Sequence, residues 1–121
     1  MNPDHGPVGL PRAYLRPCLL LLLSEGGSHG YDLLDQVRAL GLVGADAGGL
    51  YRTLRSMERD DLVSSWWEPS QSGPARRTYA LTEAGRESLD RSMDALAITQ
   101  RLAGAVLDRY SQLVARIDQP R

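Results

Sequence analysis

The chain has no lysine and only one cysteine, and each scarcity narrows what the protein can do. All 14 basic residues of the 121-residue sequence are arginine, so any anion that the chain binds is met by planar guanidinium groups, which donate paired hydrogen bonds. The single cysteine, Cys18, has no partner for an internal disulfide. Its place in a run of leucines indicates a small core side chain rather than a reactive thiol.

Long apolar runs and a strong net charge are also missing. The longest apolar stretch, residues 18–23, is far shorter than the roughly 20 residues of a membrane span, and the start of the chain lacks the basic region of a signal peptide. We therefore expect a cytoplasmic protein with no membrane partner. Because the net charge is −1 and the pI is about 6.1, any binding to nucleic acid must depend on a local group of arginines.

The residue patterns of metal sites and active sites do not occur either. Two histidines and one cysteine show no ligand spacing such as C-x-x-C or H-x-x-x-H. The sequence has no nucleophile elbow, no phosphate-binding loop and no paired carboxylates in a recognisable setting. We therefore expect no cofactor, no metal ion and no enzymatic activity.

What the sequence does contain is the pattern of one small folded domain. Its 42% hydrophobic and 24% charged residues are typical of globular proteins, and its length suits a single core. We expect residues 1–11, rich in proline and glycine, to form a flexible arm. A first helix follows from Arg12, with Pro17 either starting or kinking it and Gly26 and Gly27 ending it.

Two further short helices are predicted next. Ser28 can cap the second helix, which ends at Gly41, and Asp46 can cap the third, which runs to about Asp60. The apolar residues of each helix recur mainly at spacings of three and four, which turns one face toward a core. They are Tyr31, Leu33, Leu34, Val37 and Leu40 in the second helix, and Leu50, Leu54 and Met57 in the third.

Residues 62–81 change character and predict a β-hairpin. Two segments rich in β-branched and aromatic residues are joined by a Ser-Gly-Pro turn. Trp66 and Trp67 are adjacent in the first strand, so we expect one indole in the core and the other outside. Arg76 and Arg77 follow the turn, and the same alternation sends them to opposite faces.

The last helix is predicted to be long and to mediate dimerisation. Thr82 caps it, and no proline interrupts it before Ile117, so at about 1.5 Å per residue it would span roughly 50 Å. Its apolar residues alternate spacings of four and three, the period of a coiled-coil seam, although packing on its own domain is the alternative. We expect a homodimer whose interface contains Leu20 of the apolar first helix together with Leu96, Ala103, Leu107, Tyr110 and Val114.

Three short helices followed by a hairpin make a winged helix-turn-helix. The predicted fold class is therefore mostly α with a β-hairpin (α+β): an arm at 1–11, a winged helix-turn-helix at 12–81 and a dimerisation helix at 82–121. In such a domain the third helix enters the major groove of double-stranded DNA, and the hairpin touches the backbone or the minor groove. Arg52 and Arg55 share one helix face and can reach guanine edges or phosphates. The expected DNA contacts are Tyr51, Arg52, Arg55, Arg76 and Arg77, although any single arginine could instead be a solvated surface charge.

Three segments resemble the PadR family of bacterial transcriptional regulators, in its shorter members with one C-terminal helix. They are HGYDLLDQV (29–37), GGLYRTLRSMERDDLV (48–63) and RTYALTEAGRESL (77–89). The resemblance implies a homodimer whose long helices cross the partner's first helix and which represses an operon, through a near-palindromic operator, until a small effector releases it. In the first segment we interpret His29 and Gly30 as structural, through a hydrogen bond at the helix start and a close backbone approach.

Two residues depart from the family pattern. Arg52 stands where the family commonly has proline, and it adds a hydrogen-bond donor that relatives lack. Asp61 stands where glycine is common, so we expect Asp61 to end the third helix in a left-handed conformation, which Asp tolerates better than most residues.

The effector implied by the resemblance would be a small aromatic or hydrophobic molecule. Some relatives are reported to use tryptophan for aromatic ligands, which gives Trp66 and Trp67 a second interpretation as an effector site. A pocket elsewhere would be lined by Leu15, Cys18, Leu22, Leu96, Gln100 and Ala103.

The near-neutral charge supports one alternative function. A winged helix can serve as a scaffold that binds another protein without recognising a DNA sequence. Failure to bind the DNA upstream of its own reading frame at low salt would distinguish this alternative.

Overall fold

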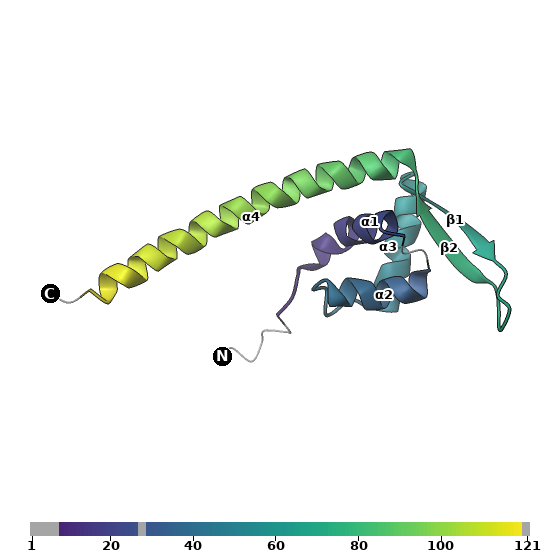
Figure 1. Ribbon diagram of the computed structural model, residues 1–121, viewed down its shortest axis with the longest axis horizontal. Helices are drawn as coiled ribbons and strands as arrows, with labels where there is room; N and C mark the ends of the chain where they lie inside the picture. Colours follow the sequence, from purple (N-terminus) through teal and green to yellow (C-terminus); the bar gives the residue numbers. More distant parts are fainter. Residues whose placement is uncertain (1–7, 27–28, 120–121) are drawn as a thin grey trace. The chain divides into compact units, whose positions relative to one another are not determined.

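The helices and strands occur in the order that the sequence predicts, and the predicted fold class is confirmed. The computed structural model describes residues 8–26 and 29–119, and the chain divides into two compact units, Met1–Leu89 and Asp90–Arg121. Its elements are the 3₁₀ helix η1 (Arg12–Tyr14), α1 (Leu15–Ser24), α2 (Gly30–Ala39), α3 (Ala47–Arg59), β1 (Val63–Glu68), β2 (Arg76–Leu81) and α4 (Glu83–Ile117) (Figure 1).

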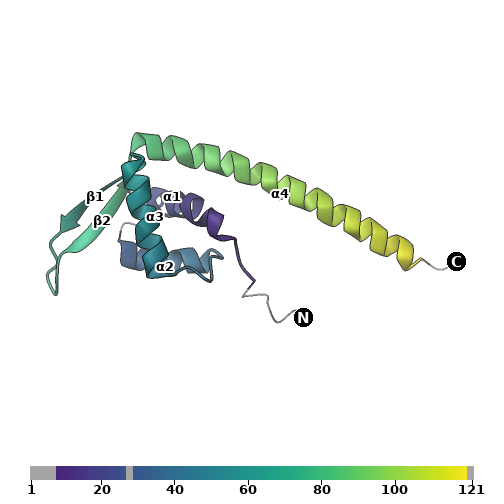
Figure 2. The ribbon, with the colours of Figure 1, turned by 180° about the vertical axis from the view of Figure 1, so that it is seen from behind.

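The first unit is built around one apolar core to which α1, α2, α3 and the hairpin all contribute. Figure 2 shows α3 between α1 and the hairpin, in contact with both. Burying one leucine or valine stabilises a fold by about 1.5–3 kcal/mol, so this cluster dominates the stability of the unit. Its fully buried side chains are Leu19, Leu20, Leu33, Val37, Leu50, Leu54, Met57 and Val63.

The first helix is buried by its own chain. Five of its ten residues, Leu15, Leu19, Leu20, Leu22 and Leu23, are buried, and the covering elements are α2, α3 and β2. The burial of these five residues therefore needs no second subunit, and Leu20 is already enclosed within its own chain.

The apolar face of α2 is narrower than predicted. Leu33 and Val37, four residues apart, are fully buried, but Tyr31 is 80% exposed and Leu40 is 42% exposed. Tyr31 precedes Leu33 by two residues, which turns it about 200° around the helix axis and away from the core. The prediction that Tyr31 and Leu40 belong to the core is wrong.

The described end of the predicted arm is attached to the domain. The backbone N–H of Leu10 donates to the carbonyl of Gly41 (2.7 Å), and the Leu10 side chain lies against Gly41. Pro17 falls in the first turn of α1, where its missing N–H leaves no helical hydrogen bond unmade. Residues 1–7 and the predicted cap Ser28 lie outside the described residues.

The end of α3 is closed by a left-handed residue, as predicted. Asp61 has a φ of +61°. The N–H of Leu62 donates to the Met57 carbonyl (2.9 Å), and the N–H of Asp61 donates to the Glu58 carbonyl (3.0 Å). These two bonds make a Schellman motif, which satisfies carbonyls that would otherwise be left without a donor.

The start of α4 is locked to this end of α3. The Thr82 hydroxyl donates to the Asp61 carbonyl (2.6 Å) and accepts from the N–H of Gly85 (3.0 Å), so it caps α4 as predicted. The backbone N–H of Thr82 also donates to the Leu62 carbonyl (3.0 Å). Gly85 then packs directly on that carbonyl oxygen, where no side chain fits.

The second unit consists mainly of the remainder of α4. No side chain of residues 90–119 is buried, and several large apolar side chains of this helix are exposed to solvent. Leu102, Leu107 and Ile117 are 64%, 64% and 70% exposed. Contiguous exposed apolar surface of this kind is typical of an interaction site.

We predict that Gly85→Ala destabilises the first unit by about 1–3 kcal/mol, because the new methyl group would overlap the Leu62 carbonyl oxygen. Urea denaturation measures the change. The matched control is Gly73→Ala, whose methyl group would meet no atom within 4 Å. Equal denaturation midpoints for the two variants would contradict the tight packing at Gly85.

Asp61→Gly should have the opposite effect. Glycine adopts a left-handed conformation without the cost of roughly 1–2 kcal/mol that other residues carry, so this variant should gain about 1 kcal/mol and melt a few degrees higher. Asp61→Ala keeps the unfavourable Cβ and should show no gain. A melting temperature that falls in Asp61→Gly would mean that the Asp61 side chain itself stabilises the turn.

Candidate nucleic-acid interface

The outer face of α3 carries a row of arginines. Asp46 accepts a hydrogen bond from the N–H of Gly49 (2.7 Å) and so caps the helix as predicted. Leu50, Leu54 and Met57 are buried on the inner side. At about 100° per residue, the opposite side of the helix then belongs to Arg52, Arg55 and Arg59, and all three are exposed.

Tyr51 lies on the flank of α3 that faces the start of α2. Its ring packs over Gly30, where a Cβ atom would be 2.6 Å from the ring carbon Cε1, and the side chain is half-buried. The predicted close approach at Gly30 is therefore confirmed. The predicted capping bond is not found: His29 is the N-cap of α2 but makes no side-chain capping bond, and its backbone bridges to Thr78 instead.

The prediction that the two hairpin arginines point to opposite faces does not separate them, because both line one groove beside β2. The strands pair antiparallel, with Trp66 opposite Thr78 and Trp67 opposite Arg77. Arg77 lies over the Trp67 ring, 5.2 Å from its centroid, and pairs with Glu58 of α3 at 3.7 Å. Arg77 is therefore held beside α3, whereas Arg76 is exposed and forms no ion pair with any described residue.

Neither tryptophan is in the core, so that prediction is wrong. Trp66 is 42% exposed and Trp67 is 63% exposed. The Trp66 indole donates to Glu68 of the same strand (3.2 Å), and Trp67 stacks on Arg77. The core reaches only the base of the hairpin, at Val63 and Tyr79, so alternation along β1 does not lead either indole into it.

A groove lies beside Tyr51 of α3 and the two arginines of β2. Its volume is about 580 Å³, and it runs between the start of α2, α3 and β2. The orphan N–H groups at a helix start attract anions, and the guanidinium groups from β2 add positive charge. The lining residues are His29, Gly30, Tyr31, Asp32, Tyr51, Arg76 and Arg77.

The carboxylates at the end of α3 are engaged in pairs. Glu58 accepts from the Ser65 hydroxyl and pairs with Arg77, and Asp60 pairs with Arg16 of α1 at 2.9 Å. Exposed pairs of this kind are worth less than about 1 kcal/mol each. Their effect is to hold Arg77 and Arg16 against the sides of α3.

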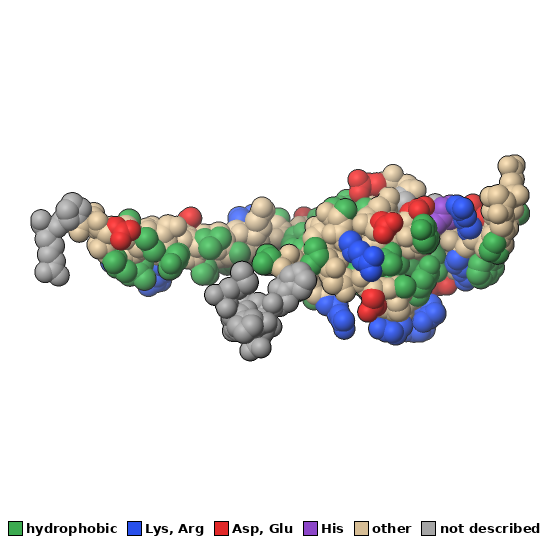
Figure 3. Space-filling view, turned by 90° about the horizontal axis from the view of Figure 1, so that it is seen from below, with side chains coloured by type: hydrophobic (Ala, Val, Ile, Leu, Met, Phe, Trp, Pro, Cys, Tyr) green, Lys and Arg blue, Asp and Glu red, His purple; other side chains and the backbone are tan. Residues whose placement is uncertain are grey.

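Sequence reasoning missed Arg16. Its guanidinium donates to the Ser56 hydroxyl (2.9 Å), across 40 positions of sequence, and no local pattern signals that contact. Figure 3 shows several arginine side chains on the face of the first unit that this view presents, with acidic side chains among them. The basic surface is thus local and mixed in sign, in keeping with the small net charge.

The residues predicted for an effector site and a dimer interface differ in exposure. Leu15, Leu20 and Leu22 are 7%, 0% and 8% exposed, so Leu20 offers a partner no surface. Cys18 is half-buried, and burial raises the pKa of its thiol, which keeps it protonated at neutral pH. On α4, Val114 is half-buried, and five residues are exposed: Leu96, Gln100, Ala103, Leu107 and Tyr110.

In residues 8–26 and 29–119, no group of three or more histidine, cysteine, aspartate or glutamate side chains is arranged to hold a metal ion. No helix in those same ranges has both the length and the hydropathy needed to cross a membrane.

The comparisons with known proteins agree with the geometry. A family model described as the transcriptional regulator PadR-like family matches residues 19–91. A PadR family transcription regulator from Clostridium difficile R20291 has a similar structure, with a TM-score of 0.69 and 26% identity over 78% of this chain and 98% of that one. The PadR-like transcriptional regulator of Bacillus cereus ATCC 14579 shares the fold, with a TM-score of 0.71 and 24% identity over 79% and 93%.

A sequence relative is found in a transposon. It is an uncharacterized 37.1 kDa protein of transposon TN4556 from Streptomyces fradiae, 31% identical over 90 residues. The match covers 74% of this chain but only 24% of the relative, so this chain spans about a quarter of that protein's length. The family model covers more than half of the chain, and the chain belongs to the PadR-like family of transcriptional regulators.

Proposed function

We propose that this protein is a sequence-specific DNA-binding homodimer that represses transcription until a small effector releases it. The observation that carries the proposal is the exposed row of Arg52, Arg55 and Arg59 on α3, with Arg76 and Arg77 on the adjacent hairpin. This role requires no catalytic group and no metal ion.

The α3 arginines are proposed to enter the major groove. A guanidinium group can donate two hydrogen bonds to the O6 and N7 atoms of guanine, the commonest specific contact of this kind. Arg52 and Arg55 lie three residues apart on the outer face, so they can meet neighbouring base pairs. Arg52 is the more distinctive of the two, because relatives commonly have proline there.

The hairpin and the start of α2 are proposed to hold the DNA backbone. Tyr51 and Arg76 line the groove beside the first turn of α2, where the hydroxyl, a guanidinium group and free helix N–H groups can all donate to one phosphate. Arg77 is held near α3 by Glu58 and Trp67, so little side-chain entropy would be lost when it meets a phosphate.

Dimerisation is proposed to occur through α4. Its exposed apolar residues, which include Leu107, Tyr110 and Ile117, follow the alternating spacing of a coiled-coil seam. Two copies of α3 related by a two-fold axis would read the half-sites of a near-palindromic operator.

Footprinting on the DNA upstream of the protein's own reading frame tests the proposal as a whole. We expect protection of an inverted repeat, together with raised transcription from that promoter when the gene is deleted. Absence of protection at low salt would contradict the proposal. It would favour the second candidate, a protein-binding winged helix, which is supported by the net charge of −1.

Arg55→Ala should weaken operator binding by about 1–3 kcal/mol, because a bidentate contact to a base would be lost. Fluorescence anisotropy with operator and with scrambled DNA measures the loss. The control Arg101→Ala removes an exposed arginine from the second unit and should leave both affinities nearly unchanged. Equal losses on the two DNAs would make Arg55 a phosphate contact and contradict its role as a base reader.

Leu107→Glu should convert the dimer to a monomer, since it places an uncompensated charge in the proposed seam. Light scattering measures the mass, and operator binding should fall with the loss of the second half-site. Gln112→Glu is the control, because Gln112 is exposed and lies outside the proposed seam. If Leu107→Glu retains the mass of a dimer, the interface is elsewhere.

A further inference from the structure

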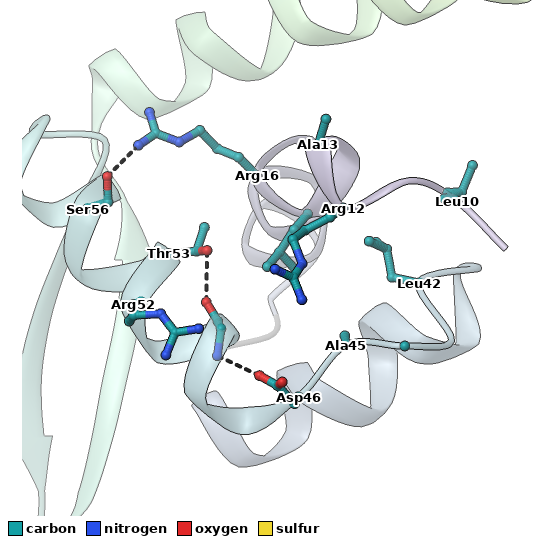
Figure 4. A pocket seen from close by; sticks show the side chains of 13 residues that line it. Leu10, Arg12, Ala13, Arg16, Leu42, Ala45, Asp46, Arg52, Thr53 and Ser56 are labelled. Atoms are coloured by element: carbon teal, nitrogen blue, oxygen red, sulfur yellow. Dashed lines mark hydrogen bonds between the residues drawn. The ribbon is translucent and has the colours of Figure 1, made fainter. Parts of the chain in front are cut away.

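A cavity of the first unit lies on the flank of α3 that faces away from Tyr51. Its volume is about 590 Å³, and it opens between the arm, η1, the start of α1, the loop before α3 and α3 itself (Figure 4). Helix α3 contributes Gly49, Thr53 and Ser56 to its wall, and their spacings of four and three place them on one side of the helix. Tyr51 precedes Thr53 by two residues, a turn of about 200° around the helix axis. The groove beside Tyr51 and this cavity therefore lie on opposite flanks of α3.

Arg52 leans toward the cavity, whereas Arg55 leans toward the groove. Arg52 lies four residues before Ser56, on the cavity side of the helix, and it lines the cavity. Arg55 lies four residues after Tyr51, on the groove side. The Arg52 guanidinium also lies back over the first turn of α3, since its Nη1 atom is 3.2 Å from the point where a Cβ atom of Gly48 would be. Its hydrogen-bond donors are thus at the start of the helix and beside the cavity.

Two arginines of this cavity are available to an anion. The described residues that line it include three arginines, Arg12, Arg16 and Arg52, but a single acid, Asp46. Arg16 is engaged by an ion pair with Asp60, whereas neither Arg12 nor Arg52 forms an ion pair with any residue of 8–26 or 29–119. Figure 4 shows the guanidinium groups of Arg12 and Arg52 pointing from η1 and α3 into the same space. An anion in this space would meet positive charge from two separate elements.

The leucines of the cavity hold the backbone of Arg12 in place. The backbone N–H of Leu10 donates to the Gly41 carbonyl (2.7 Å), and Leu15, which follows η1, is 7% exposed. Arg12 lies between these two anchored residues, although its own side chain is exposed. A guanidinium group on an anchored backbone loses less freedom on binding than one on a mobile segment.

Double-stranded DNA presents an anion at this flank when α3 lies in the major groove. The major groove is about 12 Å wide, and a helix with its side chains is about 10–12 Å across. Each flank of the helix therefore faces one of the two sugar–phosphate strands. Tyr51 and Arg76 are proposed to hold a phosphate on the groove flank, so Arg12 and Arg52 would face the other strand.

We propose that Arg12 and Arg52 form a clamp on one phosphate of the strand that faces the cavity. Each guanidinium group donates charge-assisted hydrogen bonds to a non-bridging oxygen of that phosphate. The inference rests on the proposed function and narrows it, because Arg52 then positions α3 through the DNA backbone and base recognition is left to Arg55. Arg52 stands where the family commonly has proline, so this contact is one that such relatives lack.

Salt titrations of DNA affinity, measured by fluorescence anisotropy, test the clamp. Arg12→Gln and Arg52→Gln should each weaken binding to operator and to scrambled DNA by the same factor, about tenfold per half-site. The variant with both changes should lose little more than either one, because both arginines serve the same phosphate. Its slope of log Kd against log salt should fall by about 1 per half-site, the value for one phosphate.

Two further variants serve as controls. Arg101→Gln removes an exposed arginine from the second unit and should leave both affinities and the salt slope unchanged. Arg12→Lys keeps the charge, so it should recover most of the affinity that Arg12→Gln loses. Arg12 and Arg52 are exposed, so all these variants should keep the melting temperature of the unmodified chain.

Uncharged phosphates in the DNA locate the clamp. Each phosphate of one half-site is replaced in turn by a neutral methylphosphonate. At one position the replacement should weaken binding of the unmodified chain about tenfold, but it should have no further effect on the variant that lacks both Arg12 and Arg52. The phosphate that is coupled in the same way to Arg76→Gln should lie on the other strand.

Three results would overturn the clamp. A loss confined to operator DNA would make Arg52 a base reader. Losses that add in the double variant, with a slope lower by about 2 per half-site, would place the two arginines on separate phosphates. Unchanged affinities in Arg12→Gln would remove Arg12 from the interface. In each case the unmodified chain still binds its operator and the proposed function stands, whereas a chain that bound no DNA would refute the proposed function and the clamp together.

Discussion

The burial of Leu50, Leu54 and Met57 is the constraint on which the rest of the first unit depends. These three side chains fix the rotation of α3 about its own axis, because moving any of them into water would cost about 1.5–3 kcal/mol. With that rotation fixed, the helical period leaves Arg52, Arg55 and Arg59 on the outer side. The burial of the inner face of α3 thus also determines where the basic surface lies.

The junction of α3 with α4 fixes the start of α4 relative to α3. Asp61 turns the chain at the end of α3, and Thr82 and Gly85 attach the start of α4 to the same turn. Glu58 and Ser65 fasten the hairpin to α3 from the side. The hairpin arginines therefore keep a defined position relative to α3 within the unit, which matters because base contacts need fixed geometry and a mobile wing would lose entropy on binding.

Features that depend on a few adjacent residues could be predicted from the sequence, whereas contacts between distant segments could not. The caps at Asp46 and Thr82 and the left-handed Asp61 follow from a few adjacent residues, and the structure confirms them. Burial of Trp66 could not be foreseen, because periodicity does not say how far a core extends along a hairpin. The Arg16 contact with Ser56 joins positions 40 residues apart, so no spacing rule indicates it.

The small net charge is compatible with DNA binding because charge acts locally. Helix α3 and strand β2 together contain five arginines and one glutamate, a net charge of +4, so the rest of the chain carries −5 of the total of −1. At physiological salt, charges separated by more than about 8 Å are largely screened, and a phosphate beside α3 therefore responds mainly to the local arginines. Under the proposed function, such a chain would gain little from long-range attraction to DNA, and its affinity would come from contacts that these local arginines make. The weak global field would also weaken non-specific binding, which favours selectivity for an operator over bulk DNA.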